Sequence, residues 1–222
     1  MTAGLPERPW LLLFDLDGTL IDSREDLCTA VNLMRRDYDL PPLAVERVAA
    51  YVGDGLRKLV ERGLQGHPTD LDAAVKACAA HYRNHLVDRT VLYPGVADGL
   101  PRLCAAGHRL ELISNKPGDS CRLILEHFGV ASFFRLVLGG GDTPRLKPDP
   151  EPLLLAMTRC GIPPARTWMI GDHHTDLEAA RRAGVKSVYL ADGIGDSAGE
   201  KPDFEFDSFT AMTNFFLSTS SG

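Results

Sequence analysis

The chain has 222 residues, of which 44% are hydrophobic and 24% are charged; these values are typical of a folded globular protein and argue against disorder. The net charge is -6 and no long cluster of lysine or arginine occurs, which argues against nucleic acid as a partner. No apolar run is long enough to span a membrane, and the N-terminus lacks the basic and apolar segments of a signal peptide. We therefore expect a cytoplasmic protein with no membrane partner.

The first predicted element is a strand over residues 10–14, an uninterrupted apolar run of the kind that is buried on both faces of a parallel sheet. A helix follows, with Asp22 or Ser23 as its N-cap, and ends at the Leu-Pro-Pro break at residues 40–42. Apolar spacing predicts further helices over residues 43–50, 54–64 and 70–87. Residues 21–91 are therefore expected to be purely helical.

Strands and helices alternate in the remainder of the chain. We expect strands over residues 109–113, 136–138, 168–170, 187–190 and 203–206, with helices ending at 105–107, over 117–128, near 150–160, near 175–183 and from 207 onward. This alternation predicts an α/β fold with a doubly wound, Rossmann-like parallel sheet. The core would comprise residues 1–20 and 92–222, and residues 21–91 would form a small helical cap. An insertion that leaves the carboxyl end of a strand lies over the active site, as a lid does.

Five cysteines are scattered along the chain without the spacing of a metal site or a redox pair: Cys28, Cys78, Cys104, Cys121 and Cys160. Four of them fall within predicted amphipathic helices and the fifth lies beside one. We expect them to be buried as small apolar side chains in a reducing compartment.

Two carboxylates, Asp15 and Asp17, follow the first strand directly, in the sequence Asp-Leu-Asp-Gly-Thr. Open α/β sheets keep their ligands at the carboxyl ends of the strands. The two side chains begin on the same side of the strand, and the turn at Gly18 lets the second swing over the end of the first. Because two carboxylates repel each other, the pair requires a proton or a cation. A catalytic role therefore outweighs the alternative of a simple strand-to-turn junction.

Four further polar residues follow later strands. Ser114 begins a helix, where a hydroxyl beside backbone N–H groups can hold a phosphate oxygen as well as cap the helix. Lys147 precedes a proline, which favours extended backbone, and can stabilise negative charge at this edge of the sheet. Asp172 ends an apolar strand and Asp176 lies one helical turn later. Carboxylates without thiolates indicate a hard divalent ion, hence Mg²⁺ rather than zinc.

Two adjacent histidines, His173 and His174, lie within the last of these segments. Because the side chains of neighbouring residues diverge, we expect both to face solvent or the helix rather than to bind a metal.

These segments, in this order, resemble the four motifs of the haloacid dehalogenase-like hydrolase superfamily, and they span nearly the whole chain. The resemblance implies that Asp15 takes up a phosphoryl group and that Asp17 is the general acid and base. Mg²⁺ would be held by Asp15, the carbonyl of Asp17 and Asp172, supported by Asp176, while Ser114 and Lys147 stabilise phosphoryl oxygens. The helical block resembles the small cap of the family. The residues implied in substrate binding are Thr19, Ser114, Asn115, Gly53, Gly55 and Lys58.

Within the superfamily, the Ser-Asn-Lys-Pro and Tyr-Val-Gly-Asp-Gly segments resemble those of phosphoglycolate phosphatases. The resemblance implies hydrolysis of 2-phosphoglycolate to glycolate and phosphate through an aspartyl phosphate. Gly53 and Gly55 would form a tight loop near the substrate, and Arg57 or Lys58 would bind an anionic tail; a solvated helix face is the alternative for these two. A sugar phosphatase, a mutase of the β-phosphoglucomutase type and a non-catalytic phosphate sensor stay open. So does the choice between monomer and homodimer.

Overall fold

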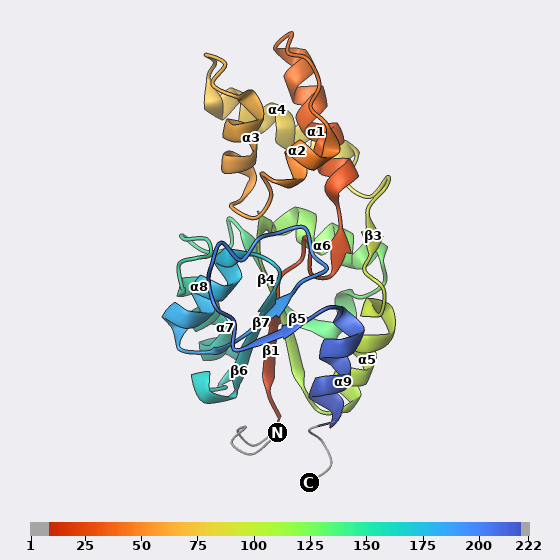
Figure 1. The fold of residues 1–222 in the computed structure, drawn as a ribbon, viewed down its shortest axis with the longest axis vertical. Helices are drawn as coiled ribbons and strands as arrows, with labels where there is room; N and C mark the ends of the chain where they lie inside the picture. Colours follow the sequence, from red (N-terminus) through yellow and green to blue (C-terminus); the bar gives the residue numbers. More distant parts are fainter. Residues whose placement is uncertain (1–8, 219–222) are drawn as a thin grey trace.

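The computed structural model describes residues 9–218. Residues 1–8 and 219–222 lie outside the described residues. The first of these ranges includes most of the N-terminal segment that was compared above with a signal peptide. The centre of the fold is a six-stranded sheet in the order β5-β4-β1-β6-β7-β8, parallel throughout (Figure 1). Its strands are β1 (Leu11–Phe14), β4 (Arg109–Pro117), β5 (Phe134–Gly140), β6 (Thr167–Gly171), β7 (Lys186–Leu190) and β8 (Phe204–Phe206).

Strand β1 lies in the middle of the sheet because its side chains are apolar on both faces, and all four are buried completely. Leu12 and Phe14 belong to one apolar cluster, and Leu11 and Leu13 to another, as the alternation of a strand requires. Helices cover both faces, which confirms the predicted doubly wound α/β fold. The first cluster is covered by α5 (Val96–Ala105), α6 (Gly118–His127) and α9 (Phe209–Ser218), and the second by α7 (Glu151–Cys160) and α8 (His174–Ala183).

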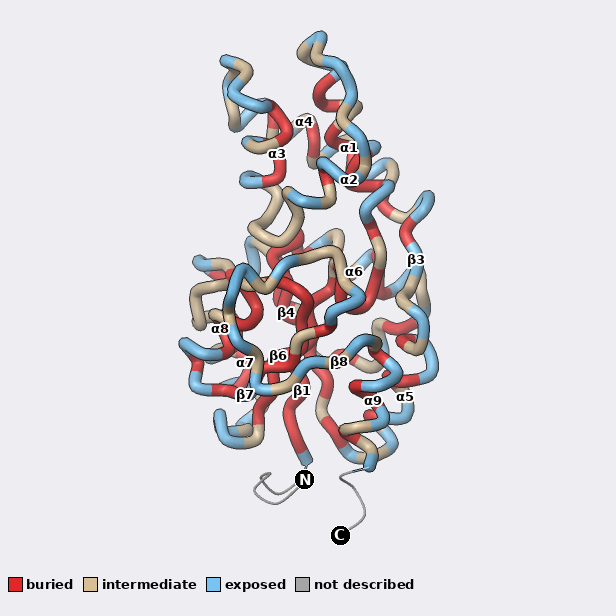
Figure 2. Tube along the Cα trace, viewed as in Figure 1, coloured by how far each residue is buried: buried red, intermediate tan, exposed pale blue. Residues whose placement is uncertain are grey.

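Four helices lie together beyond the carboxyl edge of the sheet, at the top of Figure 1. They are α1 (Arg24–Asp37), α2 (Val45–Ala49), α3 (Leu56–Leu64) and α4 (Leu71–Asn84). Helix α1 packs against α4 and α2, and α3 packs against α4. The sides of these helices that face one another carry the buried residues (Figure 2). Together they form the helical cap expected from the sequence.

Residues 21–91 are not purely helical, so this prediction was wrong at both ends of the range. Residues Ile21–Asp22 (β2) and Val91–Leu92 (β3) form a two-stranded antiparallel ribbon where the chain leaves and re-enters the core. Two residues are too few to show a strand period, and the pairing arises because the two crossings run side by side. Buried Asp26 strengthens the junction by accepting hydrogen bonds from the N–H groups of Arg89 and Thr90.

The cysteines behave largely as expected. All five cysteines are free; three are buried and Cys104 and Cys160 are half-buried. None of the helices within residues 9–218 is both long and apolar enough to span a membrane.

Candidate active site

The register of the sheet places the predicted site residues at neighbouring strand ends. Phe14 of β1 is level with Leu112 of β4 and with Ile170 of β6. The residues that follow, Asp15, Ser114 and Asp172, therefore meet at the carboxyl edge, beneath the cap. The N–H of Asp15 still donates to the carbonyl of Ile170, at 2.9 Å, so the sheet fixes the backbone of the first carboxylate directly.

Three carboxylates, Asp15, Asp172 and Asp176, converge at this edge. Each offers an oxygen within 4.8 Å of the others, and all three are buried. Burial raises the pKa of Asp15, and Asp176 adds to this although Lys147 opposes it. Burial, followed by the charges of Asp15 and Asp176, raises the pKa of Asp172 well above its ordinary value. Such a cluster favours a bound divalent cation, and an all-oxygen donor set suits Mg²⁺.

Lys147 lies between two of these carboxylates. Its Nζ is 2.9 Å from Oδ1 of Asp15 and 2.6 Å from Oδ1 of Asp176, and it also donates to the carbonyl of Ile113. Burial alone would lower the pKa of Lys147, but the two carboxylates outweigh it and raise that pKa, so the side chain stays charged. The lysine thus sits where a phosphoryl group on Asp15 would need a positive charge.

Asp172 and Asp176 also accept hydrogen bonds from neutral donors. Asp172 accepts hydrogen bonds from the hydroxyl of Thr19 at 3.1 Å and from the N–H groups of Ile194 and Gly195 at 2.9 and 2.8 Å. Asp176 accepts from the N–H of His173 at 3.2 Å. Thr19, which the resemblance implies as a substrate ligand, is buried, and its hydroxyl donates to Asp172.

Asn115 joins three segments of the site. Its Nδ2 donates to the carbonyl of Gly53 in the cap at 2.9 Å and to the carbonyl of Lys147 at 2.8 Å. Its Oδ1 accepts from the N–H of Lys147 at 2.9 Å. Ser114, the preceding residue, is buried and lines the pocket above Asp15. Asn115 therefore positions Lys147 and the cap loop together.

Asp17 has partners that the sequence reasoning missed. Its carboxylate accepts from Nζ of Lys116, at 2.7 and 3.0 Å, and from the hydroxyl of Ser23 at 2.5 Å. Ser23 is the N-cap residue of α1, yet its side chain bonds Asp17 and not the helix. The available signal was that Lys116 lies two residues beyond Ser114, on the same side of an extended strand. Strand β4 runs on to Pro117, beyond its predicted end.

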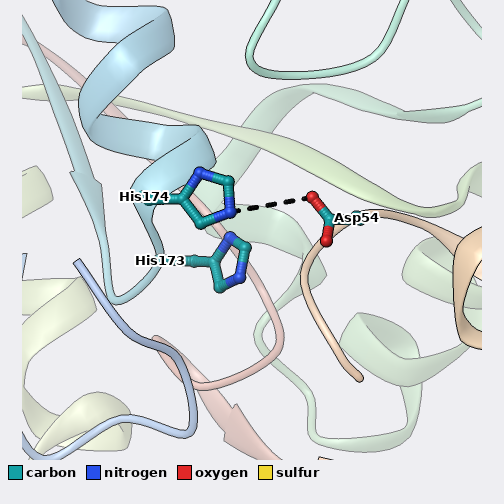
Figure 3. A group of neighbouring side chains, drawn as sticks. All are labelled: Asp54, His173 and His174. Atoms are coloured by element: carbon teal, nitrogen blue, oxygen red, sulfur yellow. Dashed lines mark ion pairs between the residues drawn. The ribbon is translucent and has the colours of Figure 1, made fainter. Parts of the chain in front are cut away.

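The cap reaches the core through the loop before α3. Gly53 and Gly55 line the pocket, and each has a positive φ, of 116° and 87° respectively. A Cβ on Gly53 would lie 2.5 Å from the ring of His173, so only glycine lets the loop approach this closely. Figure 3 shows Asp54 facing His173 and His174; Nε2 of His174 is 3.8 Å from Oδ1 of Asp54.

The ring of His173 lies between the start of α8 and the cap loop at Gly53, and His174 faces Asp54 of the cap. The ring of His173 accepts from the N–H of Thr175 and so caps α8, and burial lowers its pKa to about 4. The two cap cations expected near the substrate are elsewhere: Arg57 pairs with Asp72 and Lys58 with Glu61, all on the exposed surface. Neither lines the pocket, so the alternative of a solvated helix face describes both better.

Comparisons with known proteins agree with this geometry. The sequence profile of the haloacid dehalogenase-like hydrolases matches residues 12–190. A phosphoglycolate phosphatase of Pseudomonas putida is 38% identical over 215 residues, covering 92% of this chain and 78% of the relative. One from Chromobacterium violaceum is 37% identical, covering 90% and 92%. The crystal structure of a predicted phosphoglycolate phosphatase from Haemophilus somnus superposes with a TM-score of 0.88 at 31% identity, covering 92% of this chain and 96% of that one. The chain therefore belongs to the haloacid dehalogenase-like hydrolase family.

Proposed function

We propose that this protein is an Mg²⁺-dependent cytoplasmic phosphatase that hydrolyses 2-phosphoglycolate to glycolate and phosphate. The observation that carries the proposal is the convergence of three buried carboxylates and Lys147 at one strand edge. This arrangement supplies a nucleophile, a metal site and a fixed positive charge at one point. Relatives named phosphoglycolate phosphatase support the choice of substrate, and the free cysteines fit a reducing compartment.

Asp15 and Asp172 would hold the metal through their carboxylates and Asp17 through its carbonyl. Asp176 would support them from behind, since Lys147 and the N–H of His173 already bond its oxygens. When bound, Mg²⁺ would neutralise charge on the phosphoryl oxygens and on the crowded carboxylates.

In the first step, a carboxylate oxygen of Asp15 attacks phosphorus, and the bond from phosphorus to the substrate oxygen breaks. Asp17 gives its proton to the leaving alkoxide. In the second step Asp17 takes a proton from water, which attacks the aspartyl phosphate and releases inorganic phosphate. Lys147 and Ser114 stabilise the equatorial phosphoryl oxygens throughout.

Residues 21–91 act as a cap in this proposal, and residues 1–20 and 92–222 as the catalytic core. The cap would exclude water while the aspartyl phosphate exists, and it would select the substrate. The contact from Asn115 to the carbonyl of Gly53 supports this role because it ties the loop of the cap to the segment that carries Lys147. The proposal is compatible with a monomer and with a homodimer.

The proposal is tested by measuring phosphate release, with and without Mg²⁺, from 2-phosphoglycolate, glucose 1-phosphate, nucleotides and pyrophosphate. We expect 2-phosphoglycolate to be preferred and Asp15→Asn to abolish release. Asp98→Asn, a change of an exposed acid on α5, should leave it unchanged. Conversion of glucose 1-phosphate without phosphate release would identify a mutase instead. A preference for sugar phosphates would identify a sugar phosphatase, and no turnover of any compound would favour a phosphate sensor.

A further inference from the structure

The pocket in front of Asp15 and Asp17 is small and has walls of opposite character. Its cap side is apolar and includes Leu27, Leu56 and Leu59, whereas its core side is polar. The space open to the centre of a water-sized atom is about 40 Å³. The pocket is therefore a confined space between the cap and the core.

Lys116 is the one cation among the described residues that line this pocket. Its side chain is 2% exposed, its Nζ contacts the carboxylate of Asp17, and the same Nζ lies 4.5 Å from the centre of the Tyr82 ring. Within residues 9–218, Asp17 is the one anionic partner of this ammonium, which has three donors and can bind a second anion.

Tyr82 brings a second donor to the same place from helix α4 of the cap. The residue is buried, it lines the pocket, and its hydroxyl makes no hydrogen bond of regular geometry with any of residues 9–218. Burial raises the pKa of Tyr82, so the hydroxyl keeps its proton. The ammonium of Lys116 interacts with this hydroxyl, and a ligand that accepts a hydrogen bond from the hydroxyl would use the proton that it still offers.

The balance of charge assigns Lys116 a task distinct from that of Lys147. Lys147 already faces Asp15 and Asp176 and would serve the phosphoryl group. A phosphorylated acid brings a further negative charge at the other end of a short chain. In the cap, Arg62 pairs with Asp54, and Arg57 and Lys58 pair with exposed acids. Among the pocket residues, Lys116 alone can neutralise that charge.

We propose that Lys116, assisted by the hydroxyl of Tyr82, binds the carboxylate of the substrate and sets the preference of the enzyme for phosphorylated short-chain acids. This inference rests on the proposed phosphatase function and deepens it. Lys116 contributes from the core and Tyr82 from the cap, so the substrate carboxylate joins the two. In this proposal Lys116, near the end of β4, has the anion-binding role that was expected of Arg57 or Lys58.

The test compares substrates that differ only in the carboxylate: 2-phosphoglycolate against ethyl phosphate, and 2-phospholactate against isopropyl phosphate. The readout is the ratio of kcat/KM within each pair. A variant that acts through Asp17 lowers kcat/KM for both members of a pair, so the ratio stays the same. A variant that weakens carboxylate binding lowers kcat/KM for the acid alone, so the ratio falls. KM for the acid should carry most of the change.

Lys116→Met should lower both ratios by about 10- to 100-fold, the value of a charge-assisted hydrogen bond in a buried site. Tyr82→Phe keeps the ring against Lys116 and should lower them by about 3- to 10-fold. The control is Lys76→Met, which changes an exposed lysine on the same helix as Tyr82. It should leave the ratios unchanged.

The inference is overturned if Lys116→Met slows both members of each pair equally, because Lys116 then only positions Asp17. Unchanged ratios in Tyr82→Phe would remove Tyr82 from the site while leaving Lys116 to be judged by its own variant. The proposed function fails separately, if the wild-type protein releases no phosphate from any of the four compounds. In that event the affinity for glycolate, measured by calorimetric titration, decides the inference. Equal affinity of the wild type and Lys116→Met for glycolate would contradict it.

Discussion

Replacing Asn115 with alanine removes the side chain that joins the cap loop, the Lys147 segment and strand β4. The change deletes three hydrogen bonds, of 2.9, 2.8 and 2.9 Å, and leaves the N–H of Lys147 without its acceptor. Each such bond contributes about 0.5–1.5 kcal/mol, so the free energy of unfolding should fall by about 2–4 kcal/mol. For a chain of this size 1 kcal/mol shifts Tm by about 2–4 °C, which predicts a decrease of roughly 5–15 °C.

The same variant should lose activity at temperatures where it is fully folded. Lys147 would no longer be aligned on Asp15, and a displacement of about 1 Å in such a site costs about 100-fold in rate. The assays are urea unfolding and kcat/KM for 2-phosphoglycolate. Asn214→Ala is the matched control, because its exposed side chain makes one 3.4 Å contact with Arg102; it should change stability by less than about 0.5 kcal/mol. Wild-type kcat/KM in folded Asn115→Ala would refute the positioning role, and an unchanged Tm would refute the energetic argument.

Four further predictions concern the cap loop, the junction between cap and core, the burial of His173 and the metal. Gly53→Ala should raise KM in initial-rate assays, because a Cβ would lie 2.5 Å from the ring of His173 at a φ of 116°; an unchanged KM would show that the loop need not approach so closely. Asp26→Asn should lower the unfolding free energy by about 1–3 kcal/mol in urea, because the N–H groups of Arg89 and Thr90 lose a charged acceptor; equal midpoints would contradict this. Burial lowers the pKa of His173 to about 4, whereas an unfolded His has a pKa of about 6.5. Between these two pH values the unfolded chain binds more protons than the folded one. The free energy of unfolding should therefore fall by up to about 3 kcal/mol as the pH drops from about 6.5 to about 4. His173→Gln should flatten that part of the pH–stability profile, and an identical slope would count against the burial argument. Chelation with EDTA should abolish phosphate release and added Mg²⁺ should restore it, whereas full turnover in EDTA would exclude a metal role.

The sequence made the core of the site predictable because its chemistry lies directly after buried strands. Asp15 and Asp172 each follow an apolar run, and parallel strands bring such ends to one edge whatever the intervening chain does. Helical spacing was enough to locate the cap, since its apolar faces recur every three or four residues. The ribbon at Ile21–Asp22 and Val91–Leu92 escaped this reading because two residues carry no period.

Contacts that depend on side-chain direction across long separations were not predictable. Lys116 and Asp17 are 99 residues apart, and the local signal, the position of this lysine two residues after Ser114, does not indicate which carboxylate it contacts. Tyr82 reads as an ordinary apolar-face residue of α4 until the cap is placed on the core. The turn of Ser23 away from its own helix toward Asp17 likewise follows from tertiary packing and not from its N-cap position.

The central claim is that Asp15 carries the phosphoryl group of 2-phosphoglycolate during turnover. The most direct measurement is mass spectrometry of the enzyme quenched in acid while it hydrolyses this substrate in the presence of Mg²⁺. We expect one phosphoryl group on the peptide that contains Asp15, and none in Asp15→Asn. Phosphate release at the wild-type rate with no label on that peptide, or steady turnover by Asp15→Asn, would contradict the account.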